Sequence, residues 1–226
     1  KEVNSQTLQF ALRNLETAYT NFFQKRAKFP TYHSKKGKNT FTVPQFATIE
    51  NSKLWLPKFK SGITIRLHRE IKGKMDKVSL TKTPTGKYFV SVLVEVNEDI
   101  PKLNPIDENK AVGIDLGIKT FAVLSNGEEI QNPKHLRSAL KRLKKQQRRV
   151  SKKVKGSNNR KKAVKKLAIL HEKVSNKRND FLHKVTAKLV LEHDTLCLET
   201  LKVSNMIKNH KLAQALSDIS IGKFNR

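Results

Sequence analysis

Apolar residues recur every three or four positions near the start of the chain, and this spacing predicts a helix over residues 2–26. The apolar face of this helix consists of Leu8, Leu12, Leu15, Tyr19, Phe22 and Phe23. From about residue 41 to residue 96 apolar and polar residues alternate, interrupted by Pro, Gly and Asn, which predicts short strands. Two of them form a predicted hairpin with its turn at residues 84–86, and the set favours a small barrel or a curled sheet.

The second half of the chain alternates between short strands and long helices. Residues 97–110 contain two prolines and no periodicity, so we expect a linker and a domain boundary there. An apolar run to Leu116 and a second run at residues 120–124 predict two strands joined by a tight turn, with a short third strand after them. Two helices broken at "KGSNN" then predict a helical hairpin. "TLCLET" predicts a short buried strand that ends at Glu199, and the remainder is at least partly helical.

Each predicted helix of the hairpin has one apolar stripe. In the first helix the stripe consists of Leu136, Leu140, Leu143, Gln147, Val150 and Val154. In the second it consists of Val164, Leu167, His171, Val174, Arg178, Phe181 and Val185. His171 and Arg178 are the polar members of that stripe, and we interpret them as a snorkelling or hydrogen-bonded pair rather than as catalytic groups.

The charge of the chain is strongly unbalanced. It has 226 residues, with 47 Lys and Arg against 19 Asp and Glu, for a formal net charge of +28. An excess of this size predicts a polyanionic partner, for which nucleic acid is the first candidate and an anionic membrane surface the second. No uncharged apolar run is long enough to span a bilayer, so we expect no transmembrane segment.

Cysteine usage points to a reducing compartment. Cys197 is the single cysteine, so no disulfide can form within the chain and no Cys-rich zinc site can exist. The chain opens at Lys1 without a charged and apolar leader, so we expect no signal peptide and a cytoplasmic location. Cys197 itself is most simply a small core residue.

The positive charge is concentrated in the predicted helical hairpin. Between Lys134 and Arg178 there are 19 Lys and Arg residues and one acid, Glu172. Such a block predicts contacts with phosphates, because a helix face that only needs solvation usually interleaves both signs. A solvated face is the alternative. The predicted nucleic-acid-binding residues are the densest cluster, Arg148, Arg149, Lys152 and Lys153, together with Lys144, Lys145, Arg160 and Lys161.

Two carboxylates stand at the ends of apolar strands in this basic chain. Asp115 follows "VGI" and Glu199 follows "TLCL". If the two strands are neighbours, both acids could bind Mg²⁺ or Mn²⁺, which prefer oxygen ligands, and activate water for phosphodiester cleavage. Three alternatives stay open. Asp115 could begin an ordinary turn or belong to an actin-like ATPase, and Glu199 could pair with a nearby Lys.

Several stretches closely resemble TnpB (OrfB) proteins, which bacterial insertion sequences encode and which are related to the type V CRISPR nucleases. In the second half these are "VGIDLGIKTFAVLSNGEEIQNPKHLR", "LKRLKKQQRRVSKKVKGSNNRKKAVKKLAILHEKVSNKRNDFLHKVT" and "CLETLKVSNMIKNHKLAQALSDIS". In the first half they are "VNSQTLQFALRNLETAYTNFF", "IRLHREIKGK" and "TPTGKYFVSVLVEV". Their order and spacing cover nearly the whole chain, so the resemblance is specific.

The resemblance implies an α+β chain of two parts. Residues 1–30 would be the end of a helical recognition region and residues 31–100 a small wedge-type β-barrel. A linker at residues 101–110 would lead to a RuvC nuclease domain with an RNase H-like fold at residues 111–226.

The implied activity is RNA-guided DNA cleavage by two-metal catalysis. Its partners are a guide RNA from the element's own end and a target DNA, its cofactor is Mg²⁺ or Mn²⁺, and its location is the cytoplasm, at the nucleoid of a bacterial or archaeal cell. By this resemblance, Asp115 matches the first catalytic and metal-binding carboxylate and Glu199 the second.

The family pattern also has a third catalytic Asp on a later segment and usually a zinc ribbon of two CxxC motifs before it. These residues show neither, because Asp218 is the only acid after Glu199 and Cys197 the only cysteine. Asp218 lies in a predicted helix, so we do not expect it to substitute. We therefore expect an incomplete RuvC domain that is inactive alone, with a non-catalytic RNA- or DNA-binding remnant or regulator as the alternative.

Overall fold

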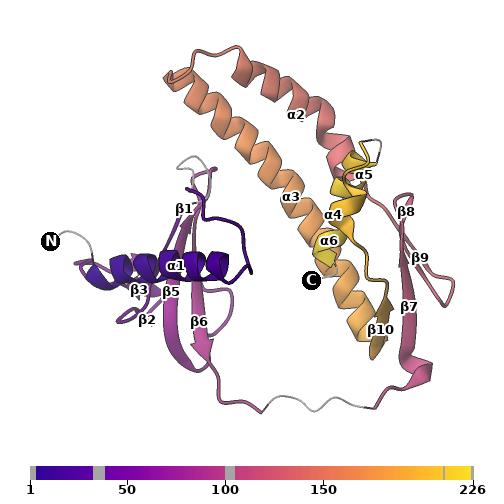
Figure 1. Ribbon diagram of the computed structural model, residues 1–226, viewed down its shortest axis with the longest axis horizontal. Helices are drawn as coiled ribbons and strands as arrows, with labels where there is room; N and C mark the ends of the chain where they lie inside the picture. Colours follow the sequence, from indigo (N-terminus) through magenta and orange to yellow (C-terminus); the bar gives the residue numbers. More distant parts are fainter. Residues whose placement is uncertain (1–3, 33–38, 100–104, 211, 225–226) are drawn as a thin grey trace. The chain divides into compact units, whose positions relative to one another are not determined.

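The computed structural model describes residues 4–32, 39–99, 105–210 and 212–224, and the chain divides into two compact units, Lys1–Pro101 and Lys102–Arg226 (Figure 1). Both units combine helices with small sheets, so the described part of the chain has the predicted α+β structure. Part of the predicted linker, residues 100–104, lies outside the described residues. Among the helices of the described ranges, none is long and apolar enough to cross a membrane.

The first unit begins with the predicted helix, α1 (Ser5–Phe23). The side chain of Asn4 caps it by accepting a hydrogen bond from the backbone N–H of Gln6 at 2.8 Å, which satisfies one unpaired donor of the first turn. None of the residues of α1 is buried, and Leu12 and Phe23 are 67% and 74% exposed. The apolar stripe that predicts the helix is therefore open to solvent.

Two antiparallel sheets of three strands each complete the first unit. Their orders are β1-β5-β6 and β2-β3-β4. The bounds are β1 (Asn39–Val43), β2 (Thr48–Glu50), β3 (Lys53–Trp55), β4 (Ile63–Thr64), β5 (Lys74–Lys82) and β6 (Tyr88–Glu95). β5 and β6 are the predicted hairpin, whose turn closes when the Gly86 N–H donates to the Thr83 carbonyl at 2.9 Å. The two sheets share a buried core of Val43, Leu54, Leu56 and Val78.

Within residues 39–99 the strands do not close into a barrel, which corrects the prediction of a small β-barrel for residues 31–100. Closure needs strand pairing that continues around the whole sheet. Over these residues, β2, β3 and β4 are only three, three and two residues long and pair with one another alone. Phe46, Asn51 and Ser52 have φ of 61°, 50° and 58°, so the chain turns sharply on both sides of β2 instead of extending its pairing. The result is two open sheets with a shared core.

One four-stranded sheet, in the order β10-β7-β8-β9, is the centre of the second unit. The bounds are β7 (Ala111–Leu116), β8 (Thr120–Leu124), β9 (Glu129–Gln131) and β10 (Thr195–Leu198). β7, β8 and β9 are consecutive antiparallel strands, as the sequence predicts. β10 returns after two helices and pairs with β7 in parallel, which requires a long crossover of this kind. A short 3₁₀ helix, Glu108–Lys110, leads into β7.

The predicted helical hairpin is confirmed and consists of α2 (His135–Ser151) and α3 (Asn158–Glu192). After β10 come three short helices, α4 (Val203–Met206), α5 (Ala213–Ile219) and α6 (Ile221–Phe224). The later part of α3 and the helices α5 and α6 cover one face of the sheet. Their common core contains Val112, Ile114, Phe121, Ala122, Leu124, Leu182, Val185, Leu189, Leu216, Ile219 and Ile221. Phe121 is fully buried between the rings of Phe181 and Phe224.

Four residues of the predicted apolar stripes are exposed instead: Gln147, Val154, Val164 and His171. The buried residues of α2 are Leu143, Gln146 and Val150. Gln146 and Gln147 both fit a spacing of three and four. Gln146 faces inward because its Nε2 donates to the Ala163 carbonyl of α3 at 3.1 Å. Val154 and Val164 lie near the hairpin turn, between the end of α2 and the early part of α3.

The prediction of a buried strand at "TLCLET" is also wrong, and so is the prediction of a core cysteine. β10 is an edge strand in the described sheet and has a neighbour on one side only. Side chains alternate between the two faces of a sheet. Leu196 pairs with buried Val112 on the face that the helices cover, whereas Cys197 pairs with Gly113 on the other face and is exposed.

Candidate active site and nucleic-acid interface

Asp115 and Glu199 stand at the ends of neighbouring parallel strands. β10 pairs with β7 from Thr195 opposite Ala111 to Leu198 opposite Ile114. Asp115 follows Ile114 and Glu199 follows Leu198, so each acid comes one residue after the last pair of this ladder. The carboxyl ends of parallel strands lie at one edge of a sheet, where ligand sites of open sheets usually form. Strand pairing thus brings to one edge the chain segments of two acids that are 84 positions apart in the sequence.

Both carboxylates are exposed. Val112 and Ile114 point into the core at 2% and 4% exposure, so Asp115 points to the face of the sheet that the helices do not cover. Over the described ranges, neither Asp115 nor Glu199 forms an ion pair. The described part of the chain therefore supplies no Lys partner for Glu199, and both acids keep their oxygens free for another ligand.

The glycine that follows Asp115 by two positions serves the turn between β7 and β8. The N–H of Gly117 donates to the carbonyl of Phe121 at 3.1 Å. A Cβ at this position would lie 2.9 Å from the carbonyl oxygen of Thr120, closer than side chains approach a backbone oxygen. Glycine therefore allows the chain to turn back directly after Leu116, which leaves Asp115 one residue from the end of β7.

Two exposed carboxylates form a set of oxygen donors that fits a hard divalent cation such as Mg²⁺ or Mn²⁺. In residues 105–210 and 212–224, as in the described first unit, no group of three or more His, Cys, Asp or Glu side chains is placed to hold a metal ion. Asp115 and Glu199 would thus supply two ligands of such a cation. The single cysteine, Cys197, is exposed on β10, so these residues do not fit the zinc ribbon that the resemblance implies.

Asp218, the one acid after Glu199, lies in a different environment. It belongs to α5 and is 8% exposed. Its two carboxylate oxygens accept hydrogen bonds from the backbone N–H groups of Leu136 and Arg137 at 2.7 and 3.0 Å. Its Oδ1 also lies 3.8 Å from Nε of Arg178. Backbone donors of α2 therefore occupy this carboxylate, and the guanidinium of Arg178 in α3 adds an ion pair without a hydrogen bond from Nε.

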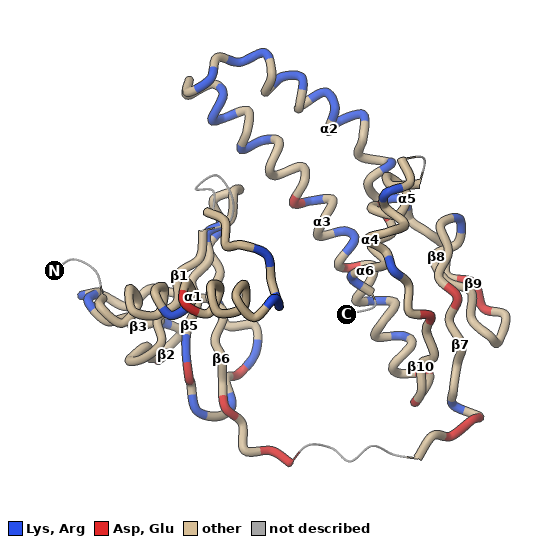
Figure 2. The backbone as a smooth tube through the Cα atoms, in the orientation of Figure 1, with Lys and Arg blue, Asp and Glu red and all other residues tan. Residues whose placement is uncertain are grey.

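The hairpin of α2 and α3 carries the predicted phosphate-binding residues. Figure 2 shows Lys and Arg distributed along both helices. Seven of the eight predicted residues are exposed: Lys144, Lys145, Arg148, Arg149, Lys152, Lys153 and Lys161. Within the described residues, none of the seven forms an ion pair with an acid. Their charge is not neutralised in the unit, so it remains to attract an external polyanion.

Arg160, the eighth predicted residue, is half-buried in the hairpin turn. Its Nη1 donates to the carbonyls of Val150 and Lys153 at 2.7 and 3.0 Å. Carbonyls of the last helical turn lack the usual donors four residues on, and Arg160 adds a charged donor to the Val150 carbonyl, which also accepts from the N–H of Lys153 at 3.2 Å. The backbone N–H of Arg160 donates to Oγ of Ser157, the N-cap of α3, at 3.2 Å. Arg160 thus joins the end of α2 to the beginning of α3.

The sequence does not identify the groups that hold the beginning of α2 in place. His135 begins α2 and contacts the ring of Phe181 edge-to-face. Burial lowers the pKa of the His135 imidazole below its usual 6.5, and the charge of Lys177 adds to this, against the opposite effect of Asp218. The sequence gives one indirect sign of these groups. Lys134 is at the N-cap position, and it cannot accept the hydrogen bond that Ser, Thr, Asp or Asn accepts there.

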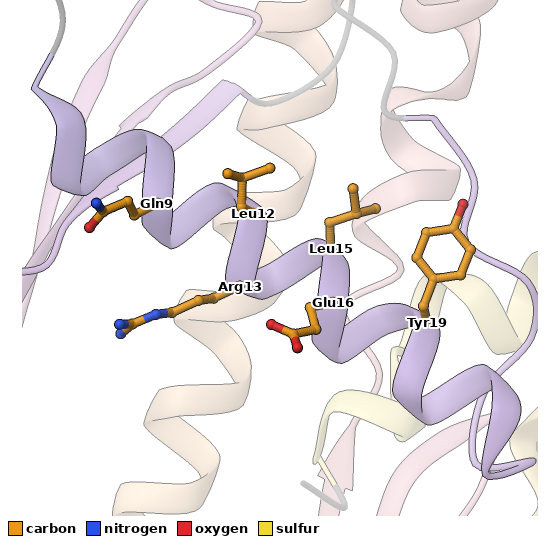
Figure 3. Close-up of a pocket in the computed structure, with 6 residues that line it drawn as sticks. All are labelled: Gln9, Leu12, Arg13, Leu15, Glu16 and Tyr19. Atoms are coloured by element: carbon orange, nitrogen blue, oxygen red, sulfur yellow. The ribbon is translucent and has the colours of Figure 1, made fainter.

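A groove on α1 in the first unit is lined by Gln9, Leu12, Arg13, Leu15, Glu16 and Tyr19 (Figure 3). Leu12, Leu15 and Tyr19 point to one side of the helix, whereas Arg13 and Glu16 point away from them. The lining has one cation, one acid, and neither histidine nor cysteine. It offers no set of groups for catalysis or metal binding.

The sheet with Asp115 and Glu199 and the cationic hairpin lie in the segment that matches a known family. The chain belongs to the OrfB_IS605 family, described as "Probable transposase", whose pattern matches residues 91–210. This segment includes both carboxylates and all eight predicted phosphate-binding residues. It ends before Asp218.

Curated relatives match over nearly the whole chain. The chain is 44% identical over 223 residues to "Putative RNA-guided DNA endonuclease" of Streptomyces pristinaespiralis, with 96% of this chain and 54% of that protein covered. It is 36% identical over 211 residues to "Putative RNA-guided DNA endonuclease InsQ" of Escherichia coli K12, with 92% and 51% covered. These matches confirm the resemblance to TnpB proteins. The chain spans about half the length of the curated relatives it matches.

Proposed function

We propose that this chain is part of an RNA-guided DNA endonuclease of the TnpB type that belongs to a transposable element. The observation that supports the proposal is the register of β10 on β7, which pairs the residue before Glu199 with the residue before Asp115, in a unit with a strongly cationic hairpin. The names of two relatives support it. Residues 111–226 would then be an incomplete RuvC-like domain of the RNase H-like type. The first unit would be the end of a recognition region followed by a wedge-type domain.

The hairpin binds the phosphates of a guide RNA or of its target DNA in this proposal. α2 has 17 residues and, at about 1.5 Å per residue, a length of about 26 Å. A duplex repeats about every 34 Å, so the hairpin can follow most of one helical turn of nucleic acid. Its exposed cations have no acidic partners among the described residues, and so each phosphate contact displaces counterions and makes binding dependent on salt.

Asp115 and Glu199 hold Mg²⁺ or Mn²⁺ through their carboxylate oxygens in this proposal. Such ions, when bound, stabilise charge on a phosphodiester and lower the pKa of water, and pairs of them serve both the attacking and the leaving oxygen. The chain contributes the position of the two acids, exposed on the open face at the edge of the sheet. Two adjacent carboxylates repel a bare phosphate. They therefore admit a nucleic acid only together with a cation.

A second candidate function is binding of RNA or DNA without cleavage. The observation that favours it is the absence of a third acid beside Asp115 and Glu199 in the described residues, where Asp218 is occupied by α2 and α3. In this case the hairpin would still bind phosphates, and the two carboxylates would not catalyse cleavage. The chain would then be a regulator or a remnant of the nuclease.

The experiment compares the 226-residue chain with a protein of the relatives' length that contains it. Each is mixed with RNA transcribed from the end of its own element, with target DNA and with Mg²⁺. We expect the chain to bind the RNA and the longer protein to cut DNA. Asp115→Ala should abolish cutting and leave RNA affinity unchanged, whereas Asp180→Ala, an exposed acid of α3, should change neither. Full cutting by Asp115→Ala would refute the catalytic assignment. Tight RNA binding without cutting by either protein would favour the second candidate.

A further inference from the structure

The start of α2 is capped by a residue of another helix. Asp218 of α5 accepts the backbone N–H groups of Leu136 and Arg137, the second and third residues of α2, at 2.7 and 3.0 Å. These are the donors that an N-cap side chain normally satisfies. The local sequence offers no such cap, because Lys134 has a left-handed backbone at φ 49° and makes no side-chain hydrogen bond there.

The same carboxylate also reaches α3. Its Oδ1 lies 3.8 Å from Nε of Arg178, and both side chains are largely buried, at 7% and 23% exposure. Nη1 of Arg178 lies 3.5 Å from Oγ of Ser220, which ends α5 with a left-handed backbone. A buried charge is retained only where it is paired and hydrogen-bonded. One carboxylate therefore joins three helices.

α5 is itself anchored in the core below the sheet. Leu216 and Ile219, on either side of Asp218 in the helix, are 1% and 4% exposed. They belong to the same core as Val112 and Ile114 of β7, the strand that carries Asp115. The side chain of Asp218 therefore connects the beginning of α2 with the core on which the candidate active site is built.

The two helices of the hairpin depend on this connection to different degrees. α3 ends at Glu192 and the chain enters β10 at Thr195, so covalent continuity places α3 beside the sheet. α2 follows a loop after β9, and its buried residues Leu143, Gln146 and Val150 belong to its middle and end. At its beginning, α2 is held by the carboxylate of Asp218 and by the edge-to-face contact of His135 with Phe181 of α3.

We propose that Asp218 is a positioning residue that fastens the beginning of α2 to the core of the sheet. It thereby sets where the Lys and Arg side chains of α2 stand relative to Asp115 and Glu199. This inference rests on the proposed function, since the relative position of the two sites matters only if one nucleic acid reaches both. Without the carboxylate, the first turn of α2 loses its cap and the helix can pivot along α3. If the cations of α2 and the two carboxylates act on one nucleic acid, their distances from each other must be fixed.

A distance measurement tests the connection directly. Cys197 is the single cysteine and is exposed on β10, so Ser138→Cys in the first turns of α2 completes a pair for spin labels. We expect one narrow distance distribution in the labelled chain and a broad one when Asp218→Ala is added. Asp218→Asn keeps the volume and one acceptor oxygen but turns an NH₂ group toward a second donor, so its distribution should lie between those of the parent and Asp218→Ala. Asp180→Asn removes a charge from an exposed site on α3 and serves as the control.

Amide hydrogen exchange and RNA affinity complete the test. Exchange at Leu136 and Arg137 should accelerate in Asp218→Ala, and RNA affinity should fall about three- to tenfold, with a smaller loss in Asp218→Asn. An unchanged distance distribution in Asp218→Ala would overturn the proposal. A broadened distribution together with an unchanged affinity for RNA would also overturn it. If Asp218→Ala does not fold, Asp218→Asn decides by the same readouts. Its amide can accept only one of the two backbone N–H groups, so we expect a broader distance distribution and faster exchange at Leu136 or Arg137 than in the parent, and parent behaviour at every readout would overturn the proposal. A parent chain that binds no RNA would refute the proposed function instead. The distances between the spin labels would still show whether Asp218 fixes the beginning of α2.

Discussion

Arg160 donates a hydrogen bond from Nη1 to the carbonyl of Val150 at 2.7 Å. The two residues lie on opposite sides of the hairpin turn, one at the start of α3 and the other at the end of α2. A cation at the end of a helix is favoured by unpaired carbonyls and by the helix dipole. A residue whose charge suggests phosphate binding therefore also stabilises the turn that presents the exposed cations.

Replacement of Arg160 should destabilise the second unit. We expect Arg160→Ala to lower its free energy of unfolding by about 1 to 2 kcal/mol, because two carbonyls lose a charged donor. Arg160→Lys should recover part of this loss, since Lys keeps the charge without the planar fork. Denaturant unfolding measured by circular dichroism checks both. Lys161→Ala is the control and should stay within about 0.5 kcal/mol of the parent. A stable Arg160→Ala chain with greatly reduced RNA affinity would instead assign Arg160 to binding.

The densest cationic cluster should determine how strongly binding depends on salt. We expect simultaneous replacement of Arg148, Arg149, Lys152 and Lys153 by Gln to weaken RNA binding. If all four contact phosphates, the slope of log K against log salt should become shallower by roughly three to four, since each contact contributes about 0.7 to 0.9. Filter binding over a salt series measures this. A control with equal charge loss replaces Lys110, Lys184, Lys202 and Lys208. Equal slopes in the two variants would show that the cluster is only a solvated face.

The carboxylate pair should bind Mn²⁺ with both acids contributing. We expect Asp115→Asn and Glu199→Gln each to weaken binding by more than about tenfold, since even groups that only orient metal ligands are worth ten- to hundredfold. The thermal stability should remain close to that of the parent, because both acids are exposed and lack ion-pair partners in the described chain. Titration with Mn²⁺ followed by electron paramagnetic resonance measures the affinity. Asp180→Asn is the control, and equal Mn²⁺ affinity in Asp115→Asn and the control would contradict the site.

His135 should make the stability of the second unit dependent on pH. Burial lowers its pKa below 6.5, so between the lowered value and 6.5 the folded state binds fewer protons than the unfolded chain. The free energy of unfolding must then rise with pH through this window and fall as the pH drops below 6.5. His135→Phe keeps a ring beside Phe181 and removes the titration, so its stability should vary less with pH. Denaturant unfolding at several pH values measures this, and identical profiles would contradict the assignment.

Short-range patterns predict most elements of the second unit. The alternation around Asp115 predicts β7, the turn and β8, and the three-four spacing after residue 133 predicts α2 and α3. The same patterns cannot choose between Gln146 and Gln147, since both satisfy the spacing and only the Ala163 carbonyl of a second helix selects one. They also overestimate the burial of Cys197, because burial depends on which face of a strand is covered.

The choice of candidate residues follows from chemistry that is visible along the chain. An acid at the end of an apolar strand and a block of Lys and Arg on helices are local features, so Asp115, Glu199 and the hairpin cations can be selected without a fold. Their meaning depends on distant partners. Glu199 comes close to β7 only because β10 pairs with β7. The sequence of one strand does not determine its register on another. Asp218 caps α2 from 82 positions away, and Arg160 becomes a cap only when the hairpin closes. Propensity and charge act between residues near in sequence, whereas these partnerships exist only after the core has packed.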